Sequence, residues 1–407
     1  MSDMDALNAL NSGAKEAIIT GLELTLPESP VGTILGGLIS WLWPDSVDGT
    51  SNQEWHLIKE EIEKIVKKKI DKQTWKDVEG YLSGLNSVLN DYVTSTKDGL
   101  SKEHIYARWS EADSDFDLFE PSFQLKGQEA LLLPLFAQFA NLRLMLLRDG
   151  VLNADSLGMN SNEKKATEQK LQGKISAYLA YVPMALDSGF PAGTYGTIPN
   201  LAPTGTLRVN VISDWNKYLR HMILNVMDYA FYWPYYDPET YQSTSSAPVK
   251  LPQPSREIYS EPYGTAFSSW IGTGMPATAP ITEVTAWYGD YLNGLQITTN
   301  EGTGPLMGYT SGTSSNDSKV SGTISGNEYL KSASGSFGDV VNTLVLKTKD
   351  SSTKAETVLL SAGNVSAQQY DEHYHQHELT NIRLFGTTPY SQAVIFGFQL
   401  RKAVKHE

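Results

Sequence analysis

Three histidines alternate with other residues in the stretch DEHYHQHE, at positions 371–378. If this stretch is a strand, His373, His375 and His377 lie on one face, because alternate side chains of a strand point the same way. Imidazoles arranged in this way can bind zinc or nickel. No supporting carboxylate or second cluster can be assigned, so we favour a polar strand face beside a loop and expect no cofactor.

The acidic stretch DSDFD, at 113–117, has the spacing with which a calcium-binding loop begins. Leu118 stands where such a loop turns on a glycine, and Gln124 replaces its last ligand, a glutamate. A solvated helix face is therefore the better interpretation. The chain also contains no P-loop, HExxH or Gly-x-Ser-x-Gly motif, so the sequence supports no enzyme.

The densest aromatic stretch is DYAFYWPYYDPETY, at 228–241, with seven rings and two prolines in fourteen positions. Rings gathered in this way can stack on sugars or bases, lie at a membrane surface, or form a buried seam between two domains. The residues of this stretch alone do not distinguish these three interpretations. The segments around it have to be considered.

Composition limits the class of protein. The net charge of −14 argues against a nucleic-acid partner, because contacts to phosphates need clustered lysine and arginine. Residues 1–262 carry 23 basic and 34 acidic side chains, so most of the negative charge lies there. The chain has no cysteine, which excludes disulfides and thiolate metal sites. Its first residues are acidic, so we expect no signal peptide and accumulation in the producing cell.

Helical spacing extends from the N-terminal region to about residue 240. Apolar residues recur in steps of three and four, for example at Ile58, Ile62 and Ile65 and again from Val78 to Tyr92. The segment QEALLLPLFAQFANLRLMLLRDG, at 128–150, is instead apolar on nearly every face. Such a helix is about 30 Å long, which matches the thickness of a bilayer core. We expect it to be the buried centre of a bundle, with the alternative that it can leave the bundle and enter lipid.

The pattern changes beyond residue 265. Short alternating runs such as ITEVTAWYG and AVIFGFQLR are separated by turn residues, as expected of an all-β sandwich or prism. A Pro- and Ser-rich stretch at 243–264 marks the boundary and cannot be helical. The fold class is therefore multi-domain, with an α part followed by an all-β part.

Residues 20–262 resemble the helical pore-forming domain of Cry δ-endotoxins, the three-domain insecticidal crystal toxins. The resemblance is carried by PVGTILGGLISWLWP, by RWSEADSDFDLFEPSFQLKGQEALLLPLFAQFANLRLMLLRDG, by WNKYLRHMILNVMDYAFYWPYYDPETY and by SREIYSEP, in the family's order and spacing. It implies a bundle of seven helices around a central fifth helix, which is the segment 128–150. The fourth helix is then SKEHIYARWSEADSDFDLFEPSF, at 101–123.

The family's activity is membrane permeabilisation, with insertion of the hairpin of helices four and five. The resemblance thus implies self-oligomerisation in a pore, and action outside the producing cell, at the target insect gut-cell membrane. We expect the fifth helix to face lipid through Leu131, Leu135, Phe139, Leu142 and Leu146. Acidic residues of the fourth helix would line water: Glu111, Asp113, Asp115 and Asp117. The rings Tyr232, Trp233, Tyr235 and Tyr236 would lie where the family packs its bundle against the next domain.

The C-terminal part, at about 278–403, resembles the β-prism of jacalin-like lectins, an architecture shared by the second domain of crystal toxins. NEYLKSASGSFGDVVNTLVLKT and LTNIRLFGTTPYSQAVIFGFQL carry this resemblance. The Gly-x-x-x-Asp turn of jacalin-type sugar sites is missing, because Gln392 or Val394 takes the Asp position and Pro389 the region of the glycine. A single prism after the bundle also resembles the larger subunit of the binary Pir toxins, down to YDEHY at 370–374, which implies a possible accessory toxin subunit as partner.

We therefore expect four parts. They are an N-terminal arm at 1–27, a helical pore-forming domain at 28–242, a linker at 243–277, and a β-prism at 278–407 that binds a membrane receptor or glycan. The arm has Lys15 and a thin apolar pattern, so we expect poor packing and clipping by a gut protease. Receptor contacts are expected in two exposed loops, at Tyr309, Thr310, Ser311, Thr387, Tyr390 and Gln392. The alternative function is a lectin-like binding protein with a helical scaffold.

Overall fold

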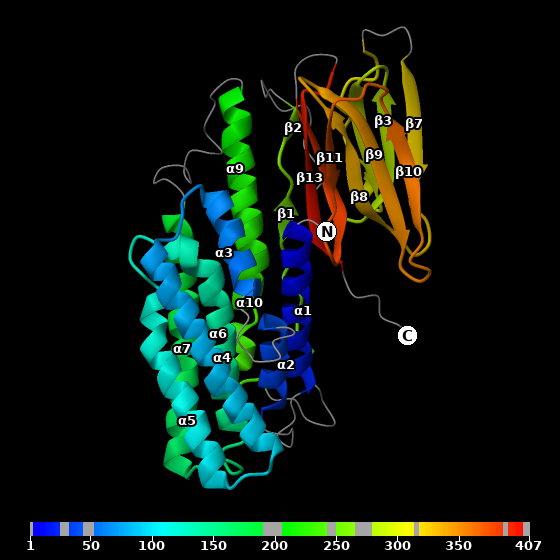
Figure 1. Ribbon diagram of the computed structural model, residues 1–407. Coiled ribbons are helices and arrows are strands. Elements are labelled where there is room, and N and C mark those ends of the chain that lie inside the picture. The colour runs from blue at the N-terminus through cyan, green and yellow to red at the C-terminus, as the bar shows by residue number, and fades with distance from the viewer. Residues whose placement is uncertain are drawn as a thin grey trace. The chain divides into compact units, whose positions relative to one another are not determined.

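The computed structural model describes residues 3–24, 32–43, 53–189, 206–241, 250–264, 279–312, 317–385 and 390–401 (Figure 1). The chain divides into two compact units. The helical unit is Met1–Tyr195 with His221–Pro252, and the prism unit is Gly196–Arg220 with Gln253–Glu407. The expected fold class, a helical bundle around an apolar helix followed by a β-prism, is confirmed.

The helical unit is built from long helices that run side by side (Figure 1). Their bounds are α1 Asp3–Leu24, α2 Thr33–Leu42, α3 Gln53–Val66, α4 Lys72–Lys97, α5 Lys102–Phe119, α6 Glu129–Leu152 and α7 Ser161–Ser188. Shorter turns complete the unit: η1 Glu120–Phe123, η2 Ile223–Met227, α10 Asp228–Ala230 and η3 Trp233–Tyr236.

Local sequence explains where these helices begin. The Asp71 carboxylate accepts hydrogen bonds from the backbone N–H groups of Gln73 and Thr74, which caps the start of α4. Asn160 and Glu163 form a reciprocal capping box at the start of α7. Beyond its cap, α4 buries the expected stripe, which includes Val78, Leu82, Leu85 and Leu89.

The N-terminal arm differs from the expectation of poor packing. Residues 3–24 form helix α1, and the side chains of Ala14, Ile18 and Leu22 are buried. These residues are spaced by four, so they form a narrow apolar stripe on one face of α1. Such a stripe is a weak signal in the sequence. The Lys15 ammonium also pairs with the Asp228 carboxylate at 2.8 Å. Clipping of this segment by a protease stays a prediction.

The described strands of the prism unit form three antiparallel sheets. The first contains β1 Glu257–Tyr259, β2 Tyr263–Gly264, β12 His377–Phe385 and β13 Ala393–Leu400. The second contains β8 Glu328–Phe337, β9 Val341–Asp350, β10 Glu356–Ala362 and β11 Gln368–Glu372. The third contains β3 Ile281–Tyr288, β4 Leu292–Thr299, β5 Gly302–Thr303, β6 Met307–Gly308 and β7 Ser318–Thr323.

The boundary between the units differs from the expected one in two ways. Strands β1 and β2 come from the expected linker and pair with β13, so the prism begins about twenty residues earlier than predicted. Helix α9, Thr206–Met222, belongs to the prism unit as far as Arg220. Its Ile212 packs against Phe385 and Ile395, and its Asn216 side chain donates to the Ser260 carbonyl at 2.7 Å. These contacts, which periodicity cannot reveal, assign most of α9 to the prism.

Candidate functional site

The expected insertion residues all lie on α6, at the centre of the helical unit. Leu131, Leu135, Phe139, Leu142 and Leu146 are each buried, as is the rest of the helix between Ala130 and Arg148. Helix α6 contacts α2, α3, α5 and α7. Among the described residues it is the one helix with the length and hydropathy to cross a membrane, and in this structure that apolar window is fully buried.

One charged residue lies in the middle of this apolar helix. Arg143 is fully buried, and its guanidinium lies 2.8 Å from the carboxylates of both Asp113 and Asp117 on α5. It also donates to the Asp113 backbone carbonyl and lies over the ring of Phe116, 5.2 Å from its centroid. A buried charge is tolerated where it is paired and hydrogen-bonded. The α5–α6 hairpin therefore contains both the charge and its counter-ions.

Helix α7 competes for the same carboxylates. Lys170 lies 2.7 Å from Asp113 and 2.6 Å from Asp117, and Lys174 lies 2.7 Å from Glu120. Burial alone would raise the pKa of Asp117, but the Lys170 hydrogen bond and the charges of Arg143, Lys170 and Lys174 lower it below its ordinary value. Both expected pore-lining residues Asp113 and Asp117 are thus engaged in ion pairs in this structure.

The other two expected pore-lining residues are less engaged. Glu111 is exposed and pairs with Arg108 at 2.9 Å on the same helix. Asp115 is half-buried, and burial together with repulsion from Glu111 raises its pKa above the ordinary value. The assignment of these four residues to a pore stays a prediction.

The C-terminal end of α6 carries two further charged residues, Asp149 and Arg148. The Asp149 carboxylate accepts hydrogen bonds from the Tyr92 hydroxyl at 2.6 Å and from the Gly32 backbone N–H at 3.0 Å. Complete burial raises the pKa of Asp149 to about 6, although these hydrogen bonds oppose the change. Arg148, also buried, donates to the Tyr236 carbonyl at 3.0 Å, and burial lowers its pKa to about 10.

The aromatic stretch packs against α6 within the helical unit. The Trp233 indole donates to the Asn141 side chain at 2.8 Å, and its ring lies edge-on to Phe136 and Tyr178. Tyr232 and Tyr236 are buried as well, while Tyr235 is half-buried. The rings thus contribute to the core around the central helix. Their role at a domain seam stays a prediction.

Hydrogen bonds connect the tip of the α5–α6 hairpin to the loop between α3 and α4. Lys68 donates to the Gly127 carbonyl at 3.0 Å. Gln128 accepts from the Asp71 N–H at 3.2 Å and donates to the Thr74 hydroxyl at 3.1 Å. These bonds hold the tip in place. Because they lie near the surface, breaking them costs only a modest free energy.

The expected receptor residues lie at loops of the prism. Tyr309, Thr310 and Ser311 are exposed, with 41% of the Tyr309 side chain accessible. Tyr390 is half-buried and its ring packs against Tyr291 at 5.2 Å between centroids. Thr387 lies outside the described residues.

The structure describes both residues that could take the position of the missing aspartate. Gln392 is half-buried in the segment before β13, and its N–H donates to the Phe385 carbonyl at 2.7 Å. Val394 is fully buried in β13, where it pairs with Tyr263 and Leu384. Neither residue offers a carboxylate to a sugar.

Two of the three histidines have separate partners in the structure. His377 is buried, with one ring nitrogen 2.7 Å from Arg256 and the other 2.5 Å from the His375 carbonyl. His373 lies 3.5 Å from the Asp371 carboxylate. Within the described part of the chain, no group of three or more His, Asp or Glu side chains has the arrangement of a metal site.

Sequence reasoning missed several residues of this site. It did not identify the partners of Arg143, and it did not single out Lys170, Lys174 or Asp149. The available signal was one charged residue inside an apolar run, which demands a counter-charge on a neighbouring helix. Which helix supplies that charge depends on tertiary packing.

The fold and the buried hairpin define a known class. Residues 18–237 match the family model of the delta endotoxin N-terminal domain, which is more than half of the chain. The chain therefore belongs to the delta endotoxin family.

Two curated relatives are crystal proteins. The chain is 27% identical over 271 residues to the pesticidal crystal protein Cry7Aa of Bacillus thuringiensis, covering 64% of this chain and 22% of that protein. It is 27% identical over 261 residues to Cry1Be of the same species, covering 60% and 19%. The chain thus matches less than a quarter of the length of these relatives.

Solved structures extend the similarity in fold to the prism. The insecticidal delta-endotoxin Cry8Ea1 of Bacillus thuringiensis is 20% identical, with a TM-score of 0.75 over 100% of this chain and 74% of that chain. PirB is 13% identical, with a TM-score of 0.70 over 96% of this chain and 94% of that chain. Both resemblances expected from the sequence, to Cry toxins and to the Pir layout, are confirmed at the level of fold.

Proposed function

We propose that this chain is an insecticidal pore-forming toxin whose prism unit binds a receptor or glycan on target gut cells. Its α5–α6 hairpin then enters the membrane and forms a pore with other copies. Action takes place outside the producing cell. Membership of the delta endotoxin family supports this proposal.

The observation that carries the proposal is the pairing of Arg143 with Asp113 and Asp117. Lipid is a poor solvent for an isolated charge, so an arginine at the middle of a spanning helix needs a partner that enters with it. Both partners lie on α5, the other arm of the hairpin. The hairpin can therefore leave the bundle without separating these charges.

The length of α6 supports the same step. Its 24 residues extend about 36 Å, enough to cross the hydrocarbon core with its backbone hydrogen bonds satisfied internally. In the bundle its leucines already lie in an apolar environment, which lipid would replace. Exit is then favourable where a bilayer is present, and unfavourable in water by about 25 cal/mol per Å² of apolar surface exposed.

A second candidate is a subunit that needs a partner protein. The similarity in fold to PirB supports it, because that alignment covers almost all of both chains. In that case the purified chain would bind target membranes but kill larvae only together with its partner.

Dye release from liposomes and from gut-membrane vesicles tests the proposal. A pore-forming toxin releases dye from vesicles of target tissue, whereas a lectin-like binding protein adheres to them without leakage. Larvae fed the purified chain alone then test the need for a partner. Adherence without any leakage, with larvae unaffected, would contradict pore formation by this chain alone.

A further inference from the structure

A run of lysines lies beside the tip of the α5–α6 hairpin. Residues 64–76 contain six lysines and one aspartate, in a chain whose net charge is −14. We name as the tip lysines Lys68, Lys69, Lys72, Lys76 and Lys126, all of which are exposed. Their concentration here runs against the charge of the molecule as a whole.

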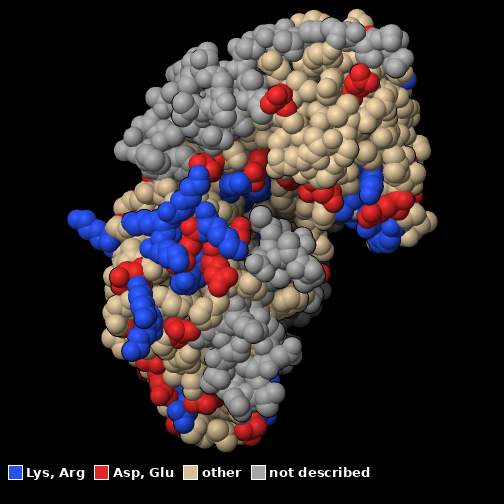
Figure 2. Space-filling view, turned by 45° about the horizontal axis from the view of Figure 1, so that its top comes forward, with Lys and Arg blue, Asp and Glu red and all other residues tan. Residues whose placement is uncertain are grey.

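Two separate segments bring the tip lysines together. Lys68 to Lys76 occupy the α3–α4 loop and the first two turns of α4, and Lys126 lies in the hairpin loop. The loops are joined by the bond from Lys68 to the Gly127 carbonyl and by that from Asp71 to Gln128. Figure 2 shows basic side chains gathered over one end of the helical unit, with acidic ones between them.

Carboxylates do not neutralise the tip lysines. Among the described residues none of the five forms an ion pair, in contrast to Lys170 and Lys174. The neighbouring acids are used locally: Asp71 caps α4, and Glu129 accepts from the Gly127 N–H at 2.7 Å. The ammonium groups therefore remain available to an external anion.

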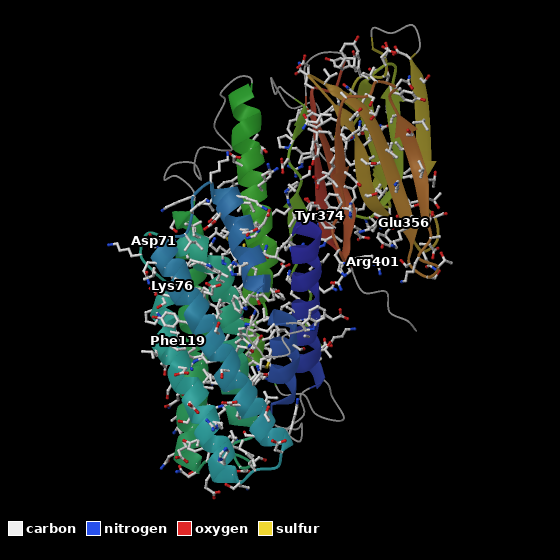
Figure 3. The ribbon with its side chains drawn as sticks, viewed as in Figure 1. Asp71, Lys76, Phe119, Glu356, Tyr374 and Arg401 are labelled. Carbon is white, nitrogen blue, oxygen red and sulfur yellow. The ribbon has the colours of Figure 1, made fainter. Side chains whose placement is uncertain are left out.

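Apolar and aromatic groups follow along the side of the helical unit that leads away from the tip lysines (Figure 3). Leu118, in the last turn of α5, is 70% exposed. Trp75 is half-buried beside Lys76, and Tyr81 stacks on Phe119 at 4.5 Å between centroids. Asp71, Lys76 and Phe119 follow one another along one side of the helical unit (Figure 3). Tryptophan and tyrosine favour the interfacial layer of a membrane, and lysine clusters are attracted to anionic lipid headgroups.

We propose that the tip lysines form a docking surface for anionic lipid headgroups, which brings the hairpin loop to the bilayer before insertion. The surface is spread over two loops and mixes ammonium with apolar groups, which suits a plane of headgroups better than the regular phosphate spacing of a duplex. The proposal rests on the pore-forming function above, in that the docked hairpin is the one that inserts. Binding without insertion is nevertheless a separate event that can be measured alone.

The test compares two variants of equal charge in the full chain. The tip variant is Lys68→Gln, Lys69→Gln, Lys72→Gln and Lys76→Gln. The control variant is Lys97→Gln, Lys102→Gln, Lys164→Gln and Lys165→Gln, at the opposite ends of α4, α5 and α7. Each set removes four positive charges, and each includes one lysine that donates to a backbone carbonyl, Lys68 or Lys102.

Sedimentation with vesicles of phosphatidylcholine containing phosphatidylserine measures binding, and thermal unfolding checks that both variants fold. We expect at least tenfold weaker binding by the tip variant, less than twofold change in the control, and loss of this difference at high salt. The proposal would be overturned if the two variants bind equally well, whether binding is kept or lost in both. It would also be overturned if the wild type binds vesicles of pure phosphatidylcholine as well as the anionic ones. Tighter binding to duplex DNA than to the anionic vesicles would overturn it as well.

Leakage recorded on the same vesicles separates this proposal from the pore. Lysine-dependent binding without dye release would contradict the pore and leave the docking surface intact. Dye release from anionic vesicles that is identical in the tip variant would support the pore and contradict the docking surface.

Discussion

Asp149 is an acid whose pKa is raised by the folded structure. Its pKa is about 6, above the ordinary 3.8, so the folded state favours the protonated form. The stabilisation is present below pH 4 and is lost as the pH rises through 6. The difference between these pKa values corresponds to about 3 kcal/mol of unfolding free energy.

Asp149→Asn should therefore remove this pH dependence. The substituted amide keeps an oxygen to accept from the Tyr92 hydroxyl and the Gly32 N–H, but it cannot ionise. We expect the variant to gain about 3 kcal/mol on the wild type between pH 4 and pH 7. Urea unfolding at both pH values measures this. Parallel pH profiles of the two proteins would show that Asp149 does not ionise in this range.

Lys170 and Lys174 hold the carboxylates of the hairpin from outside it. Replacing both by glutamine leaves Asp113 and Asp117 paired with Arg143 alone, which removes the lysine ion pairs between α7 and the hairpin. Such partly exposed ion pairs contribute about 1 kcal/mol each at most, so we expect a loss of about 1–2 kcal/mol of unfolding free energy. Dye release should become several-fold faster, because fewer bonds oppose hairpin exit.

The control for this prediction lies on the same helix. Lys164→Gln with Lys165→Gln removes equal charge one to three turns away, without breaking an ion pair to the hairpin. Leakage by the Lys170 and Lys174 variant that is no faster than by this control would contradict a restraining role for the two lysines.

The sequence predicted residue types better than residue partners. The residue pattern of 128–150 correctly indicated that α6 is apolar on nearly every face, and a helix of this kind is buried in the bundle. That Asp113 and Asp117 face Arg143 could not be predicted, since the spacing of α5 fits a solvated face equally well. Ion pairs between helices depend on the rotation and axial offset of both helices, and neither is encoded in one helix alone.

At the scale of elements, the loops of the prism offer the most direct test of recognition. Tyr309 is exposed, so Tyr309→Ala should leave the fold unchanged and weaken binding to target-tissue vesicles by about tenfold if it is a central contact. Val358, 54% exposed on β10, supplies a matched apolar control through Val358→Ala. Tyr390 packs on Tyr291, so Tyr390→Ala also risks altering the loop.

A result against this assignment is equally clear. If Tyr309→Ala binds normally, and exchange of the helical unit for that of another family member abolishes binding, recognition does not reside in this loop of the prism. The missing aspartate near β13 predicts in either case that simple monosaccharides compete poorly.

The type of most elements, helix or strand, could be predicted from the sequence. The unit to which each element belongs could not. Helical and strand periods separate near residue 240, and turn residues separate the strands. The assignment of α9 and β1 to the prism unit depends on long-range contacts such as Asn216 with Ser260 and Ile258 with Phe398. The apolar spacing of a helix shows which of its faces is buried, but it does not indicate the unit against which that face packs.

At the scale of the whole molecule, the account makes one central claim: the α5–α6 hairpin must leave the bundle to make a pore. Because the chain has no cysteine, the hairpin can be crosslinked at chosen positions alone. Thr74 and Gln128 are suitable, since their side chains are 3.1 Å apart and join the start of α4 to the hairpin tip. Thr74→Cys with Gln128→Cys, joined by a short bismaleimide that contains a disulfide, gives a reversible crosslink.

The most direct measurement is dye release by this crosslinked protein before and after reduction, beside the two single-cysteine variants treated with the same reagent. We predict that the crosslinked protein still binds vesicles, releases no dye, and regains leakage when the reagent is cleaved. The single-cysteine variants should leak throughout. If the protein, shown to be fully crosslinked, leaks as fast as its reduced form, the α5–α6 hairpin does not make the pore.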